Sequence, residues 1–125
     1  MSNTKHDRSE NPLEPIKGKQ LSAVCFVQDY VQLQFDGPGL TAVTLPTVTI
    51  GKETYEFGML NYRNVLCERI AKIVREASVA EGEQIRIEFE DRSSISVSLK
   101  PPENPRISEM AIFDNGPSDF WVWNT

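Results

Sequence analysis

The sequence predicts an α+β fold: a largely antiparallel twisted sheet of about six or seven strands, containing two related β-hairpins, with one long helix packed on the sheet. Three observations predict it. Residues 29–45 recur 54 positions later as residues 83–99 without a gap, and corresponding positions keep their apolar or polar character. Several segments alternate apolar and polar residues, which is typical of half-buried strands. One segment instead repeats apolar residues every three or four positions, which is typical of a helix.

Length and composition indicate one folded domain preceded by an arm. The 125 residues match the size of a single compact domain. Residues 1–18 are polar and contain Pro12 and Pro15, so they offer no periodic apolar face and are predicted to form a disordered N-terminal arm. A single domain is predicted over residues 19–125.

The repeated hairpin supplies four of the predicted strands. In the first copy Val31, Leu33 and Phe35 alternate with polar residues, a glycine-rich turn follows, and residues 40–45 return. In the second copy the same alternation covers residues 85–89, the turn lies at 91–93, and residues 94–99 return. Residues 21–27 are rich in β-forming side chains and are predicted to add a strand before the first copy.

The segment between the two copies is predicted to contain a third hairpin and the helix. Residues 47–50 and 53–57 flank Gly51-Lys52, a pair suited to a type II′ turn. The helix is predicted from Tyr62 to Ala77, with Asn61 as its N-cap. Its apolar stripe consists of Tyr62, Leu66, Ile70, Ile73, Val74 and Ala77. Its basic residues Arg63, Arg69, Lys72 and Arg75 are assigned to a solvated face or, alternatively, to an anion-binding stripe.

Charge and cysteine content limit the possible partners and compartment. Thirteen Lys and Arg against eighteen Asp and Glu give a formal net charge of −5. This charge repels nucleic-acid phosphates and anionic lipid, so we expect neither nucleic acid nor membrane as a partner. The chain shows no secretory signal and no spanning segment, which favours a cytoplasmic location. Cys25 and Cys67 are then expected to be reduced, small core residues.

The residue types needed for common catalytic sites are scarce. The single histidine, His6, lies in the predicted arm, so no Ser-His or Cys-His pair and no histidine-based metal site is expected. No Cys-x-x-Cys or phosphate-binding loop occurs, and no catalytic residue, metal or cofactor is predicted. Glu88 and Glu90 share one predicted strand face, where they are expected to be solvated rather than to act as an acid/base pair.

The C-terminal aromatic cluster is the candidate interaction patch. Residues 106–113 are predicted to form a short helix or an irregular segment, and residues 120–123 a last strand. In that strand Phe120 would face one side, and Trp121 and Trp123 the other. Either loops cover the two indoles, or Phe120, Trp121 and Trp123 form an exposed patch that binds a protein, a second copy or a flat ligand.

The segment Leu21 to Gly37 resembles a small bacterial protein family of unknown function, through Phe26-Val27-Gln28-Asp29-Tyr30-Val31 and Phe35-Asp36-Gly37. The resemblance covers the middle two-thirds of the chain. It implies a compact α+β domain, and it gives no activity and no catalytic residue to this chain.

Two hypotheses for function follow from the sequence. The first is a non-enzymatic protein-interaction module, for example a regulatory or immunity-like protein whose acidic charge steers it to a basic partner. The alternative is a small-ligand-binding protein or carboxylate-dependent enzyme with a pocket between helix and sheet. The lining residues proposed for that pocket are Tyr30, Tyr55, Tyr62, Glu88 and Glu90. Self-association is compatible with either hypothesis.

Overall fold

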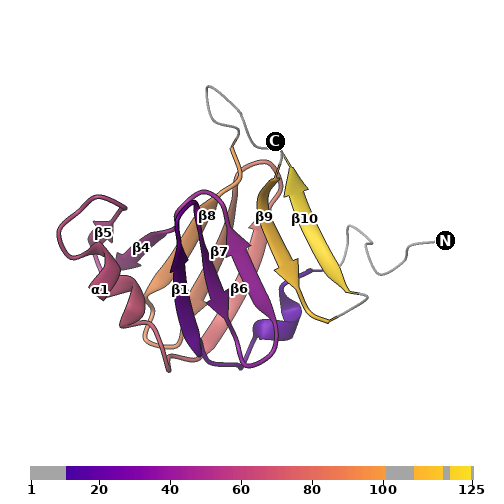
Figure 1. The fold of residues 1–125 in the computed structure, drawn as a ribbon. Coiled ribbons are helices and arrows are strands. Elements are labelled where there is room, and N and C mark those ends of the chain that lie inside the picture. The colour runs from indigo at the N-terminus through magenta and orange to yellow at the C-terminus, as the bar shows by residue number, and fades with distance from the viewer. Residues whose placement is uncertain (1–10, 101–108, 117–118, 125) are drawn as a thin grey trace.

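The protein forms two five-stranded antiparallel sheets packed as a sandwich (Figure 1). The structure is a computed structural model, and it describes residues 11–100, 109–116 and 119–124. The first sheet has the order β1 (Ala23–Val27), β2 (Tyr30–Gln34), β3 (Gly39–Ala42), β9 (Glu109–Asp114), β10 (Phe120–Asn124). The second has the order β5 (Glu53–Tyr55), β4 (Thr47–Ile50), β8 (Ser94–Ser98), β7 (Gln84–Phe89), β6 (Val74–Ala80).

The predicted α+β fold with one long helix is wrong. The helix α1 spans only Tyr62–Cys67, and the end of the predicted helix, from Val74 to Ala77, lies in strand β6. Ala71 has a φ of 79°, in the left-handed region, where an α-helix cannot continue. The predicted single sheet of six or seven strands is two sheets instead, although its antiparallel pairing is confirmed.

A β-bulge explains why β6 imitates a helix in the sequence. Along β6 the register against β7 shifts between Val74 and Glu76, so Arg75 is an extra residue on this strand. Val74 and Ala77 therefore both face the core, although they are three positions apart. A spacing of three is normally a helical signal, and here it comes from one inserted residue in a strand.

The two related hairpins are present, one in each sheet. In both copies the first strand directs the same three positions inward: Val31, Leu33 and Phe35 in the first, and Ile85, Ile87 and Phe89 in the second. All six are fully buried. The repeat therefore marks equivalent strands, one in each sheet, that contribute the same three positions to the core.

The return strands of the two hairpins differ by one residue. Phe35 donates its N–H to the Pro38 carbonyl across a two-residue turn, whereas Phe89 donates to the Ser93 carbonyl across a three-residue loop. Arg92, the last residue of that loop, has a φ of 76°, as three-residue hairpin loops require at this position. Because of the extra loop residue, the inward-facing positions of β8 come one residue later in the repeat than those of β3, the equivalent strand of the first hairpin.

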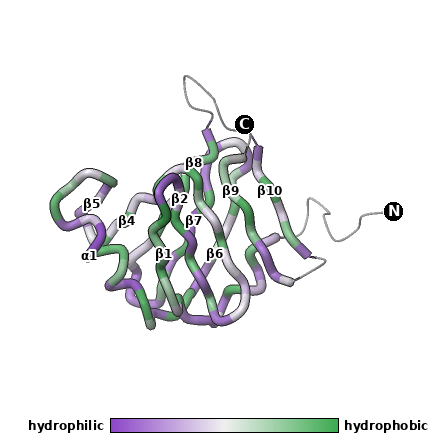
Figure 2. Tube along the Cα trace, in the orientation of Figure 1, coloured by the Kyte–Doolittle hydropathy of each residue, from purple (hydrophilic) through white to green (hydrophobic). Residues whose placement is uncertain are grey.

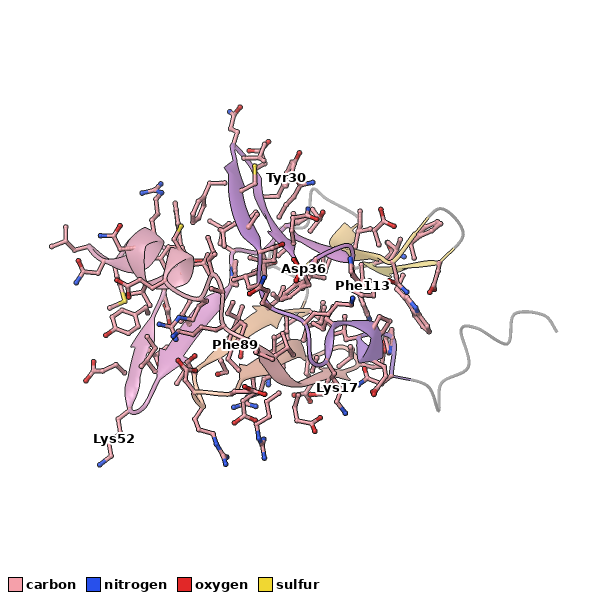
Figure 3. All side chains as sticks on the ribbon, turned by 90° about the horizontal axis from the view of Figure 1, so that it is seen from below. Lys17, Tyr30, Asp36, Lys52, Phe89 and Phe113 are labelled. Atoms are coloured by element: carbon pink, nitrogen blue, oxygen red, sulfur yellow. The ribbon has the colours of Figure 1, made fainter. Side chains whose placement is uncertain are left out.

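The core lies between the sheets. Phe89 from one sheet and Phe113 from the other are fully buried and point into the space between the layers (Figure 3). Along the tube in Figure 2, apolar stretches concentrate in the strands, while the turns at the lower end are mainly hydrophilic. The buried apolar face of each sheet accordingly packs on that of the other.

The described part of the predicted N-terminal arm is packed. Residues 14–16 form a 3-10 helix (Glu14–Ile16), and Leu13 and Ile16 are fully buried. The side-chain amide of Asn11 donates to the Ala77 carbonyl on β6, with an N···O distance of 2.6 Å. The packed chain thus begins by Asn11 rather than at Lys19. Residues 1–10, with His6, lie outside the described residues.

Several shorter predictions can also be compared with the structure. The β4–β5 hairpin is confirmed, and Gly51 has the positive φ, 62°, that a type II′ turn needs at its first central position. The last strand, β10, is confirmed, but Glu109–Asp114 is strand β9 rather than a short helix or an irregular segment, and residues 106–108 of that prediction lie outside the described residues. The prediction that Cys25 and Cys67 are core residues is wrong, because both residues are exposed. Among the described residues, no helix has the length and apolar character to cross a membrane.

Candidate interaction surface

The two most exposed large apolar residues of the described chain, Leu60 and Phe57, lie in the loop between β5 and α1. Phe57, Met59 and Leu60, here called the apolar loop, are 55%, 49% and 98% exposed. The loop stands at one end of the sandwich, beside α1 and away from β10 (Figure 1). Apolar side chains grouped in this way are typical of contact surfaces, because water gives them no favourable partner.

The loop has a defined backbone. Met59 donates its N–H to the Glu56 carbonyl, and Tyr62 donates to the Met59 carbonyl, each at 3.0 to 3.1 Å. The Glu56 N–H in turn points at the Met59 sulfur, 3.2 Å away. Gly58 supplies the positive φ, 101°, that the chain needs between these turns. The apolar side chains are therefore presented by consecutive turns.

Tyr62 anchors the loop to the body of the protein. It is buried, and its hydroxyl donates to the Pro46 carbonyl at the start of β4. Burial raises the pKa of Tyr62 to about 12, although the nearby charge of Arg63 acts in the opposite direction. Its ring makes edge contacts with Phe57, 5.9 Å between centroids, and with Phe26 on β1, 6.5 Å.

Arg63 completes this aromatic cluster from the outer side. Its guanidinium carbon lies 5.6 Å from the ring centroid of Phe57 and 5.7 Å from that of Phe26. Cation–π attraction at such distances holds the guanidinium between both rings. The surface thus combines an aromatic ring, a methionine, an arginine and a leucine. The first three residue types are enriched at the centres of protein interfaces, whereas leucine is not.

The residues of the predicted aromatic patch divide between the two faces of β10. Phe120 is 51% exposed, as expected for the outer face. Trp123 is buried and Trp121 is half-buried, and both pack against the core. The alternation predicted for this strand is present, and the indoles lie on the covered side.

The residues proposed to line a pocket lie on separate elements. Tyr30 begins β2 in the first sheet, Tyr55 ends β5 in the second, and Tyr62 is buried under the apolar loop. Glu88 lies on β7, where its carboxylate is 3.2 Å from Arg75 and 3.7 Å from Arg86. Glu90 is exposed in the loop after β7.

A charged cluster connects the turn after α1 to the β7–β8 loop. Arg69, predicted to lie on a solvated face, is only 5% exposed. It donates to the Ser93 hydroxyl at 2.6 Å and lies 3.3 Å from Asp91, which Lys72 also contacts at 3.3 Å. Burial alone would raise the pKa of Asp91, but hydrogen bonds from Ser93 and Lys72 and the charge of Lys72 outweigh it, so that pKa is lowered.

This cluster is a structural feature rather than a reactive one. The Asp91 carboxylate accepts from both the N–H and the hydroxyl of Ser93, which fixes the loop that carries them. Ser93 itself is buried, so its hydroxyl offers no access to a substrate. Within the described residues, no group of three His, Cys, Asp or Glu side chains is placed to hold a metal ion.

Comparison of the chain with family models, curated proteins and solved structures finds no match. The arguments for function below accordingly use the chain's own residues.

Sequence reasoning overlooked the apolar loop. Its signal was the pair Met59-Leu60, placed between the predicted strand 53–57 and the predicted helix cap Asn61. Apolar residues in such a connecting segment belong to neither a strand face nor a helix stripe. That mismatch could have marked them as exposed.

Proposed function

We propose that this protein is a non-enzymatic module that binds another protein through the apolar loop. The observation that carries the proposal is the 98% exposure of Leu60 between Met59 and the Tyr62 anchor. Leu60 contributes almost no buried apolar surface to the fold, so this surface is still available for a partner. Its burial in an apolar pocket of the partner would make the free energy of binding more favourable.

The loop is suited to binding because it is already ordered. Tyr62 fixes its end, and Arg63 holds Phe57 from the side. A preordered contact loses less conformational entropy on association than a flexible one. Most of the free energy gained by burying Phe57, Met59 and Leu60 in a partner would therefore appear as binding affinity, because little of it is needed to order the loop.

Charge favours a basic partner. The chain carries a net charge of −5, and the exposed Glu53 and Glu56 lie on the strand and turn that lead to Phe57. Acidic residues beside an apolar contact attract a basic partner and speed its approach. A regulator or immunity-like inhibitor of a basic protein fits this combination.

Photo-crosslinking tests the proposal. A photoreactive residue replaces Leu60 in cells that naturally make the protein, and a matched one replaces Glu81, an exposed residue of the β6–β7 loop. We expect a discrete protein adduct from position 60 and none from position 81. Equal adducts from both positions, or none from position 60, contradict the proposal.

Binding of the purified partner then decides whether the adduct reflects recognition. We expect Leu60→Ser to weaken the affinity at least about tenfold, the effect of losing roughly 1.4 kcal/mol of contact. Added salt should weaken it further, since the partner is basic. Because Leu60 is exposed, its variant should unfold at the same urea concentration as the wild type. Unchanged affinity refutes the role of the loop.

A further inference from the structure

We infer that strand β10 pairs antiparallel with β10 of a second copy of the chain, joining the first sheets of the two copies into one. The inference concerns the end of the sandwich opposite the apolar loop (Figure 1), so it goes beyond the proposed function. It begins from the position of β10, which pairs with β9 on one side and is the last strand of its sheet. An edge strand presents a row of N–H and C=O groups that a second strand can bind.

Each other sheet edge in the described chain is contacted by another segment or is short. At β6, Asn11 and Gly18 donate to the Ala77 and Val74 carbonyls. At β1, Phe26 is packed against Tyr62 and Arg63 of α1. The remaining edge, β5, is only three residues long and begins with a charged residue.

Strand β10 lacks the features that usually prevent edge pairing. Its sequence, Phe-Trp-Val-Trp-Asn, contains no charge and no proline, and its only register shift lies at the last step, between Trp123 and Asn124. On its outer face Phe120 and Val122 are 51% and 40% exposed. Pairing would extend this apolar face across the junction between the two copies.

Charge favours a contact between copies at β10. Two copies each carrying −5 repel one another, and the repulsion is least where the contact itself is uncharged. A β10–β10 contact places no like charges opposite one another, because the strand has none. Added salt screens the remaining repulsion, so this self-association should strengthen with salt, opposite to the binding of a basic partner.

The register follows from symmetry. In a two-fold antiparallel pair, outward residues must lie opposite outward residues. Centring the pair on Val122 overlaps all five residues, and it sets Phe120 opposite Asn124 of the second copy. Val122 then lies directly opposite Val122, with their Cβ atoms about 5 Å apart.

Sedimentation and light scattering over a range of protein concentrations test the inference. We expect the mass to rise from that of one chain to that of two, and at a lower concentration when salt is added. Val122→Lys should keep the protein monomeric at concentrations where the wild type is dimeric. Val27→Lys is the matched control, since Val27 is 37% exposed on the other outer strand of the same sheet, and it should dimerise like the wild type.

A cysteine variant tests the register. In a background with Cys25→Ser and Cys67→Ser, Val122→Cys should form a disulfide-linked dimer on mild oxidation, and Val27→Cys should not. A wild type that stays monomeric at every concentration overturns the inference. So does a Val27→Lys variant that loses the dimer as fully as Val122→Lys. Neither result would change the crosslink expected at position 60. The proposed dimer and the proposed function of the apolar loop can therefore be refuted independently.

Discussion

Arg69 and Asp91 join two elements that are distant in the sequence: the turn after α1 and the loop between β7 and β8. Their side chains are 3.3 Å apart, and Arg69 is almost fully buried whereas Asp91 is 41% exposed. The Ser93 hydroxyl lies between them and accepts from Arg69 while donating to Asp91. The cluster thereby holds the short helix that supports the apolar loop.

Arg69→Ala should lower the free energy of unfolding by about 2 to 3 kcal/mol, which is less than the roughly 3 to 5 kcal/mol lost when a fully buried ion pair is broken, because Asp91 is partly solvated. Urea unfolding measures it. Arg75→Ala is the matched control: Arg75 is an exposed partner of Glu88, which keeps Arg86, so we expect a loss below about 0.5 kcal/mol. Equal losses in the two variants would contradict a stabilising role for the cluster.

Asp91 should make part of the stability depend on acid pH. Its pKa is lowered in the folded protein, so the unfolded chain binds a proton more readily. The stabilisation is therefore present above the unfolded pKa of about 3.9 and is lost as pH falls through the folded pKa. We expect Asp91→Asn to flatten the acid side of a curve of stability against pH, and an unchanged slope in this variant would contradict the prediction.

Tyr62 should make part of the stability depend on alkaline pH. Burial raises its pKa to about 12, so the neutral hydroxyl stabilises the fold fully below about pH 10, the unfolded pKa, and this contribution is lost as pH passes 12. At neutral pH, Tyr62→Phe should cost about 1 kcal/mol, since the Pro46 carbonyl loses its donor.

Stability measured across this range tests the prediction. The gap between the wild type and Tyr62→Phe should narrow as pH rises from about 10 to 12. A constant gap for Tyr62→Phe would show that the hydroxyl is not held neutral by burial.

Cys25 and Cys67 should react with a thiol reagent in the native protein, because both are exposed. We expect two thiols per chain to be labelled at a rate that does not change when urea is added below the unfolding transition. Cys25→Ser should remove one of them with little effect on stability. Labelling that waits for unfolding would show that the thiols are covered.

Ala71→Gly should stabilise the protein by up to about 1 kcal/mol, because alanine at a φ of 79° is strained and glycine is not. The matched control is Ala80→Gly at the end of β6, where the backbone is extended. At that position glycine should lower the free energy of unfolding by about 0.5 to 1 kcal/mol. It relieves no strain there, and it makes the unfolded chain more flexible. Thermal unfolding of both variants tests this: the midpoint should rise for Ala71→Gly and fall for Ala80→Gly.

Alternation of apolar and polar residues was sufficient to locate the hairpins. Val31, Leu33 and Phe35 and their later counterparts are buried as predicted, because a strand with one covered face imposes a period of two whichever sheet it joins. The same rule placed Phe120 and Trp123 on opposite faces of β10, as the structure has them, but it did not say which face is covered. It could not separate the two sheets, since pairing between distant strands leaves no local pattern.

The sequence by itself determined which segments are hairpins, which face of each strand is apolar, and that the chain is acidic. Only the tertiary structure decided that residues 74–80 form a strand, because the bulge at Arg75 exists through pairing with β7. It also decided that the cysteines and Leu60 are exposed and that Arg69 is buried. Exposure depends on which distant segments cover a residue, and neighbours in sequence do not specify that.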